Sequence, residues 1–176
     1  MEGLWSNYLA DSVRSFRNYK KLAERAFEQV SDEEFSRSLD EEGNSIAVIV
    51  KHIAGNARSR WRDLFTSDGE KADRNRDTEF EMIGDTRASL MEFWETGWQT
   101  LFDAIEPLSV DDFGRTITIR GEPHSLRQAL LRGVTHAAYH VGQILYLARW
   151  LEPEGEWLTI APGKSAEYRP GYRRGP

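Results

Sequence analysis

The sequence predicts an all-α protein, a four-helix bundle with a short hairpin or extended element before its last helix. Three observations predict it. Apolar residues recur every three or four positions in four long segments, serine-led capping patterns stand at helix starts, and Gly, Pro and charged residues gather between the segments. At 176 residues the chain has the length of one domain. We expect residues 1–152 to form the bundle and residues 153–176 a C-terminal tail packed partly on it, with a mobile end at 169–176.

The first helix is expected over residues 3–30, where an apolar stripe begins at Leu4 and reaches Phe27. Ser31 follows, with Glu34 three residues later. This spacing is a capping-box pattern, so it predicts a short helical turn after the first helix.

The second long helix is expected over residues 45–65, and His52 lies at the edge of its apolar stripe. Residues 66–78 are polar and lack apolar periodicity, so they form a loop. About twelve residues at roughly 3.3 Å each can span a bundle, which permits a crossover connection between parallel neighbouring helices. The charge run at 73–77 is expected to be solvated and stays outside the candidate site.

The third helix is expected over residues 79–105, with Ile83 beginning its inner face. Residues 115–123 then alternate over a few positions and close with Gly and Pro, which indicates a small extended or hairpin element. A second capping-box pattern at Ser125 begins the fourth helix, which is expected to end near Leu151.

The composition excludes several classes of function. The chain has no cysteine, so disulfides, thiolate metal sites and cysteine nucleophiles are excluded. Its net charge of −6 argues against nucleic-acid binding, which needs clustered Lys and Arg. No apolar run approaches the roughly 20 residues of a membrane span, and the first residues do not resemble a signal peptide. We therefore expect a cytoplasmic protein with no nucleic-acid or membrane partner.

Two of the four histidines are spaced for metal binding. His136 and His140 are four apart on the fourth helix, so their side chains lie one turn above each other on one face. His52, on a different helix, is positioned to supply a third ligand. The zinc-protease pattern fails because no glutamate follows His136. The alternative is that the three imidazoles are hydrogen-bonded core residues that bind no metal.

If the three imidazoles converge, they suit one divalent ion, Zn²⁺ or Ni²⁺ above all, and leave a coordination position open. Three further residues are candidates for substrate binding. Asn56 and Arg60 lie one and two turns after His52 on the same side of its helix, and Arg60 could hold an anionic group. Gln143 could bind a ligand or satisfy buried polar groups. No residue stands out as a general base, so the catalytic residues are unknown. His124 is expected at the surface.

The histidine motifs resemble those of the DinB/YfiT-like superfamily of metal-dependent proteins. One motif is Ile49-Val50-Lys51-His52-Ile53-Ala54-Gly55-Asn56. The other is Thr135-His136-Ala137-Ala138-Tyr139-His140-Val141-Gly142-Gln143-Ile144. The resemblance covers the chain to about Leu151 and corresponds to an uncharacterised subgroup.

The resemblance implies that residues 1–152 form a homodimeric bundle whose metal ligands are His52, His136 and His140. Some relatives are thiol transferases that couple bacillithiol or mycothiol to electrophiles, and others isomerise maleylpyruvate. We therefore expect a metal-dependent transferase or hydrolase that acts on a small molecule, with a low-molecular-weight thiol as a possible cosubstrate. The alternatives are a non-catalytic metal-binding or stress-response protein and a purely structural helical dimer. A cavity open at the metal would favour the enzyme.

Overall fold

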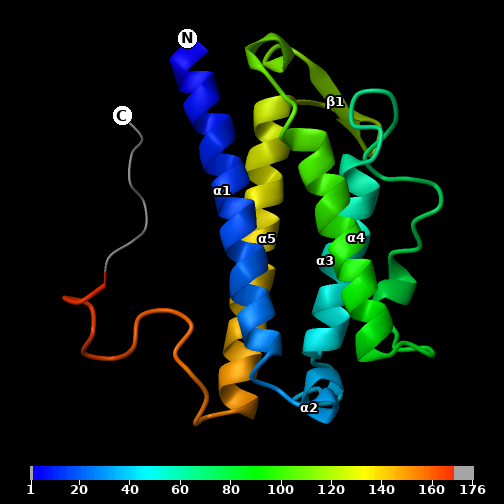
Figure 1. Cartoon of the computed structure of the whole chain (residues 1–176). Coiled ribbons are helices and arrows are strands. Elements are labelled where there is room, and N and C mark those ends of the chain that lie inside the picture. Colours follow the sequence, from blue (N-terminus) through cyan, green and yellow to red (C-terminus); the bar gives the residue numbers. More distant parts are fainter. Residues whose placement is uncertain (1, 169–176) are drawn as a thin grey trace.

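The computed structural model describes residues 2–168 and forms a bundle of four long helices (Figure 1). The short elements lie at its ends and along one side. In chain order the elements are α1 (Glu2–Phe27), α2 (Asp32–Ser36), α3 (Ile46–Trp61), the 3₁₀ turn η1 (Asp77–Phe80), α4 (Arg87–Ile105), the 3₁₀ turn η2 (Val110–Asp112), β1 (Thr116–Ile119), β2 (Glu122–Ser125) and α5 (Leu126–Leu151). The all-α bundle and the hairpin before the last helix are confirmed. The mobile end expected at 169–176 lies outside the described residues.

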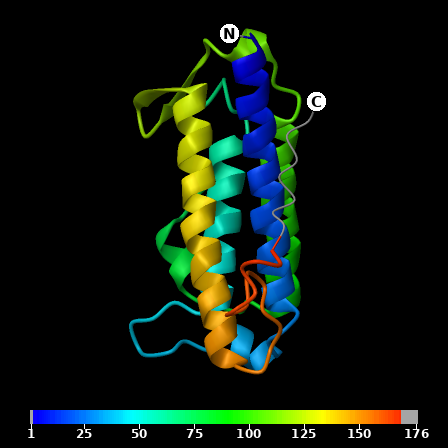
Figure 2. The same ribbon diagram turned by 90° about the vertical axis from the view of Figure 1, so that its left-hand side faces the viewer.

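The four helices form two parallel pairs that run in opposite directions. α1 packs beside α5, and α3 packs beside α4 (Figures 1 and 2). Because α3 and α4 point the same way, residues 62–86 must return along the bundle before α4 begins, and they run down its outer side (Figure 1). The connection is the crossover that the length of the polar segment permitted.

Serine side chains cap three of the α-helices, two of them through the capping boxes that the sequence predicted. The hydroxyl oxygen of Ser31 accepts a hydrogen bond from the Glu34 amide, and the Glu34 carboxylate accepts one from the Ser31 amide. Ser125 and Gln128 form the same reciprocal pair at the start of α5. Ser45 caps α3. These contacts satisfy amides that have no partner inside the helix, so the starts of α2 and α5 could be predicted from local sequence.

The third long helix is shorter than expected. It begins at Arg87, capped by Thr86, instead of near residue 79. Residues 77–80 form a 3₁₀ turn, and Gly84 has a φ of +72°, which a helix does not allow. Ile83, expected on the inner face, is 74% exposed. The predicted start of this helix was wrong because residues 79–86 belong to the connection that returns along the bundle. The first two long helices, α1 and α3, also end earlier than expected, at Phe27 instead of residue 30 and at Trp61 instead of residue 65.

Gly97 lets α3 and α4 approach each other closely. A Cβ atom on Gly97 would lie 2.8 Å from both the Cα and the carbonyl oxygen of Ala54, nearer than atoms in contact allow. The close approach helps to close the core, which is rich in aromatic rings. Phe16 lies edge-on to Trp61 and Trp98, with centroid separations of 6.1 and 6.2 Å.

The hairpin closes one end of the bundle beside α5. β1 and β2 pair antiparallel, and both turn residues, Arg120 and Gly121, have positive φ, as the tight turns of two-residue hairpins require. The Asp68 carboxylate accepts hydrogen bonds from both turn amides. Ile117 and Ile119 are buried, so the hairpin is packed onto the body of the protein.

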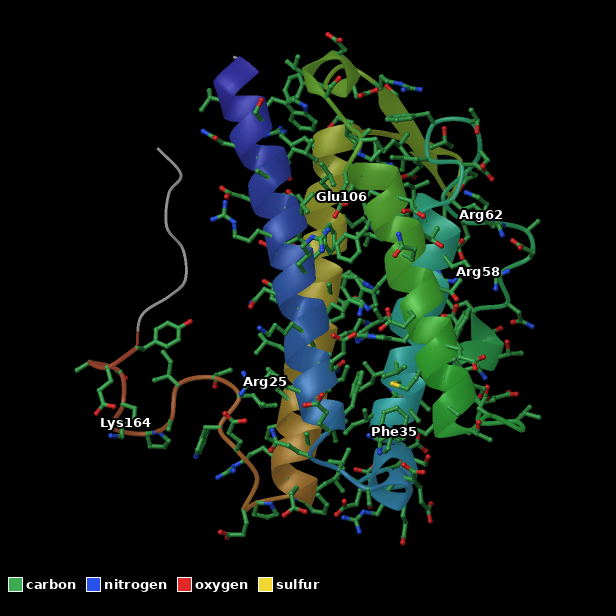
Figure 3. The ribbon with its side chains drawn as sticks, in the orientation of Figure 1. Arg25, Phe35, Arg58, Arg62, Glu106 and Lys164 are labelled. Carbon is green, nitrogen blue, oxygen red and sulfur yellow. The ribbon has the colours of Figure 1, made fainter. Side chains whose placement is uncertain are left out.

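The described part of the tail contacts the bundle. Arg25 of α1 forms an ion pair with Glu156, and the Arg149 guanidinium lies over the Trp157 ring at 4.3 Å from its centroid. Figure 3 shows Arg25 on the side of α1 that faces this segment, with Lys164 farther along it. No helix within residues 2–168 combines the length and the hydrophobicity that a bilayer crossing needs.

Candidate metal centre

Three imidazoles converge between α3 and α5. His52 comes from α3, and His136 and His140 come from successive turns of α5. One nitrogen from each ring lies within 4.8 Å of the other two. The Nε2 atoms of His52 and His136 are 3.1 Å apart. His124, the remaining histidine, is in β2, where its Nδ1 lies 3.0 Å from the Glu122 carbonyl oxygen, and it takes no part in the cluster.

Hydrogen bonds orient two of the rings. Nδ1 of His52 donates to Oε2 of Glu79 over 2.9 Å, and Nδ1 of His140 donates to Oε1 of Gln143 over 2.8 Å. With the proton on Nδ1, the lone pair of each ring is on Nε2. A carboxylate or amide that holds the outer ring nitrogen is the usual support of a metal-binding histidine.

Glu79 is buried and doubly held. The Arg74 guanidinium donates from Nε to Oε1 over 2.7 Å and from Nη2 to Oε2 over 2.8 Å. Burial alone would raise the pKa of Glu79, but the hydrogen bonds from His52 and Arg74 outweigh it, so the pKa is lowered. The carboxylate therefore stays ionised and accepts from His52. Gly55 makes room for it, since a Cβ there would lie 2.2 Å from Oε1.

The two histidines of α5 are held neutral. Burial, with the nearby imidazoles of His140 and His52, lowers the pKa of His136 to about 3. The pKa of His140 is also lowered, by burial first, against an opposing hydrogen bond to Gln143. Metal ions bind the neutral form of imidazole, so His136 and His140 are in the protonation state that metal binding requires at neutral pH.

This donor set fits a divalent ion. Two imidazole nitrogens, each 2.0–2.1 Å from a tetrahedral zinc, are held roughly 3.3 Å apart, which is close to the 3.1 Å between His52 and His136. Three nitrogen ligands suit zinc or a neighbouring late transition metal. The three histidines could therefore bind one metal ion, as their spacing in the sequence suggested.

A cavity of about 400 Å³ opens at the imidazoles. Its volume is in the range of sites that bind small molecules. All three imidazoles line it, as do Asn56 and Arg60, two of the residues proposed for substrate binding. Gln143 does not line it, and its amide oxygen accepts a hydrogen bond from His140. A substrate-binding role for any of the three stays a prediction.

Sequence reasoning missed Glu79, Arg74 and Arg132. Arg74 stands in the charge run that was expected to be solvated, yet its side chain is only 5% exposed because it is paired with Glu79. Glu79 was assigned to a helix. Arg132 lines the cavity and stands four residues before His136. That one-turn spacing was a usable signal, and so was Gly55 beside the histidine motif. No local pattern joins Arg74 or Glu79 to His52.

The fold and the site together describe a helical bundle with a three-histidine pocket between two of its helices. A family model covers residues 4–164, and the chain belongs to that family, DUF1572, whose description is a protein of unknown function. A search of curated proteins finds no match. The fold is similar to the crystal structure of a conserved protein from Enterococcus faecalis, with a TM-score of 0.59 and 13% identity over 82% of this chain and 98% of the other.

Proposed function

We propose that this protein is a metal-dependent enzyme of the DinB-like type, a transferase or hydrolase acting on a small molecule. One observation carries the proposal: the three imidazoles converge at a cavity large enough for a substrate. A structural zinc site is normally closed by four protein ligands, whereas three ligands at a cavity are typical of catalytic sites.

The residues around the histidines support this function by holding the ligands in place. Glu79 fixes the ring of His52, and Gln143 fixes that of His140, so both rings keep their orientation when a substrate enters. A bound zinc or nickel ion would act as a Lewis acid and favour the deprotonated form of a thiol or of water. We propose a low-molecular-weight thiol as the cosubstrate of a transferase. The homodimer implied by the resemblance stays a prediction.

Elemental analysis of the purified protein tests the metal first. The wild type is compared with a His136→Ala/His140→Ala variant and with His124→Ala, a control that removes a histidine outside the cluster. We expect about one equivalent of a late transition metal in the wild type and the control, and none in the double variant. No metal in the wild type, even after incubation with Zn²⁺ and Ni²⁺, would overturn the proposal.

Activity screens follow on the metal-loaded protein, with thiols and activated electrophiles and with hydrolase substrates. Turnover that disappears in the double variant and persists in His124→Ala would support the enzyme. A bound metal with no turnover in any screen would favour the alternative, a metal-binding protein without catalytic activity.

A further inference from the structure

The cavity at the histidines is lined by arginines. Within residues 2–168, five arginines contribute to its wall and no aspartate or glutamate does so: Arg60, Arg74, Arg76, Arg120 and Arg132. The chain as a whole has a net charge of −6. The net charge of the chain would predict a negatively charged cavity, whereas this one is positively charged. The positive charge is therefore a local feature of the candidate metal site.

Two of these arginines are already neutralised. Arg74 forms its paired hydrogen bonds with Glu79, and Arg120 lies 3.2 Å from a carboxylate oxygen of Glu70. The other three have no carboxylate partner within 4.0 Å among residues 2–168. Arg76 lies over the Phe80 ring, whereas Arg60 and Arg132 are on the two helices that carry the histidines.

Arg60 is the most telling of the three because it is buried. It is 8% exposed, and its Nε atom is buried with no hydrogen-bond partner in the described part of the chain. Gly69 packs against its stem, since a Cβ there would lie 2.9 Å from Cδ of Arg60. A buried guanidinium normally finds a carboxylate or another acceptor. Burial, then repulsion by Arg132, lowers the pKa of Arg60 to about 10, so the group remains charged at neutral pH.

The helices set the distance between these charges and the histidines. Arg132 is one turn from His136 on α5, four residues or roughly 6 Å along the axis. Arg60 is two turns from His52 on α3, eight residues or roughly 12 Å. Figure 1 shows α3 running toward the hairpin and α5 running away from it. Because Arg60 follows His52 on α3 and Arg132 precedes His136 on α5, both arginines lie on the hairpin side of the histidines.

We propose that the cavity binds a small anionic molecule whose carboxylate or phosphate group is held by Arg60 and Arg132 while its other end faces the three histidines. The role of this anion as a substrate rests on the proposed function, whereas its binding to the arginines does not. Guanidinium groups bind carboxylate and phosphate through paired hydrogen bonds, and such an anion would supply the partner that Arg60 lacks. The cavity volume restricts the ligand to a small molecule.

Neighbouring arginines on α3 provide a matched control. Arg58 and Arg62 do not line this cavity, and they project from the outer side of α3 toward the connecting loop (Figure 3). Arg62 pairs with Asp73, and Arg58 lies over the Phe93 ring. Arg58→Gln therefore removes the same charge from the same helix without touching the proposed anion site.

The test is calorimetric titration of the purified full-length protein with inorganic phosphate and, separately, with succinate. We expect at least one anion to bind, more weakly as salt is raised, and about tenfold or more weakly in Arg60→Gln and Arg132→Gln. Arg58→Gln should bind as the wild type does. Arg132 is exposed, so its variant keeps the test valid if Arg60→Gln does not fold. Preference for one anion identifies the group, phosphate or carboxylate, that the ligand carries.

The His136→Ala/His140→Ala variant separates this inference from the proposed function. Anion binding that persists there and is lost in Arg132→Gln supports the arginine site, whether or not the protein binds metal. Anion binding that is lost in the double histidine variant and unchanged in Arg132→Gln would place the anion on the metal. That result would overturn the inference and leave the metal proposal intact. Failure of both anions to bind the wild type would also overturn it.

Discussion

Nδ1 of His52 donates a hydrogen bond to Oε2 of Glu79, and the two residues are 27 positions apart in the chain. The contact exists because the connection between α3 and α4 returns along the bundle and places Glu79 behind the imidazole. Arg74, five residues before Glu79, completes the arrangement by holding the carboxylate from the other side. The site therefore extends beyond its three histidines to a buried ion pair supplied by a loop.

Glu79→Gln should weaken metal binding by roughly 10- to 100-fold, because the amide supports the imidazole of His52 less well than the carboxylate does. Competition with a chelator of known affinity measures the change. Glu81→Gln, at an exposed position in the same connection, is the control and should bind as the wild type does. Equal affinity in all three proteins would show that Glu79 has only a structural role.

Gly55→Ala should also weaken metal binding, by about tenfold, since the new methyl group would lie 2.2 Å from Oε1 of Glu79 and must displace it. The same chelator competition applies. The effect should be absent when Glu79 is already alanine, because the new methyl group then has no carboxylate to displace. Additive losses in the double variant would mean that Gly55 acts by another route.

Gly97→Ala should lower the free energy of unfolding by about 1–3 kcal/mol, because its Cβ would meet the Ala54 backbone where α3 and α4 approach each other. Denaturant titration measures this change in the free energy of unfolding. Gly142→Ala is the matched change in α5, where a Cβ meets no atom of the described residues within 4 Å. There the higher helix propensity of alanine should stabilise the protein by up to about 1 kcal/mol. The same destabilisation in both variants would contradict the close packing.

The metal-free protein should lose stability as the pH falls below about 6.5. His136 has a pKa of about 3 in the folded protein and its ordinary value of 6.5 when unfolded. Between these values the unfolded chain binds more protons, so acidification favours unfolding and stability rises with pH. Thermal midpoints measured from pH 7.5 to 5.0 test this, and His136→Gln should show a smaller slope. Identical slopes would mean that His136 titrates normally in the fold.

Local sequence was enough to predict the four long helical segments, apart from the start of the third, together with the caps at Ser31 and Ser125 and the pairing of two histidines. These features depend on residues within one or two turns of each other. Ser125 and Gln128 cap a helix wherever that helix packs, and His136 and His140 share a face because of the helical repeat. The third histidine could be proposed from the position of His52 near an apolar stripe and from the resemblance of its motif.

The arrangement of charged residues around the histidines depends on how distant segments of the chain pack together. Residues 79–86 had an apolar pattern that fitted a helix, yet the return of the chain between two parallel helices turned them into a connection. Glu79 thereby reached His52, and Arg60 and Arg132 came to line one cavity from separate helices. Local sequence puts Arg60 and Arg132 one or two turns from a histidine of the same helix, but it does not show that the two helices bring them to one cavity or which buried charges find a partner there.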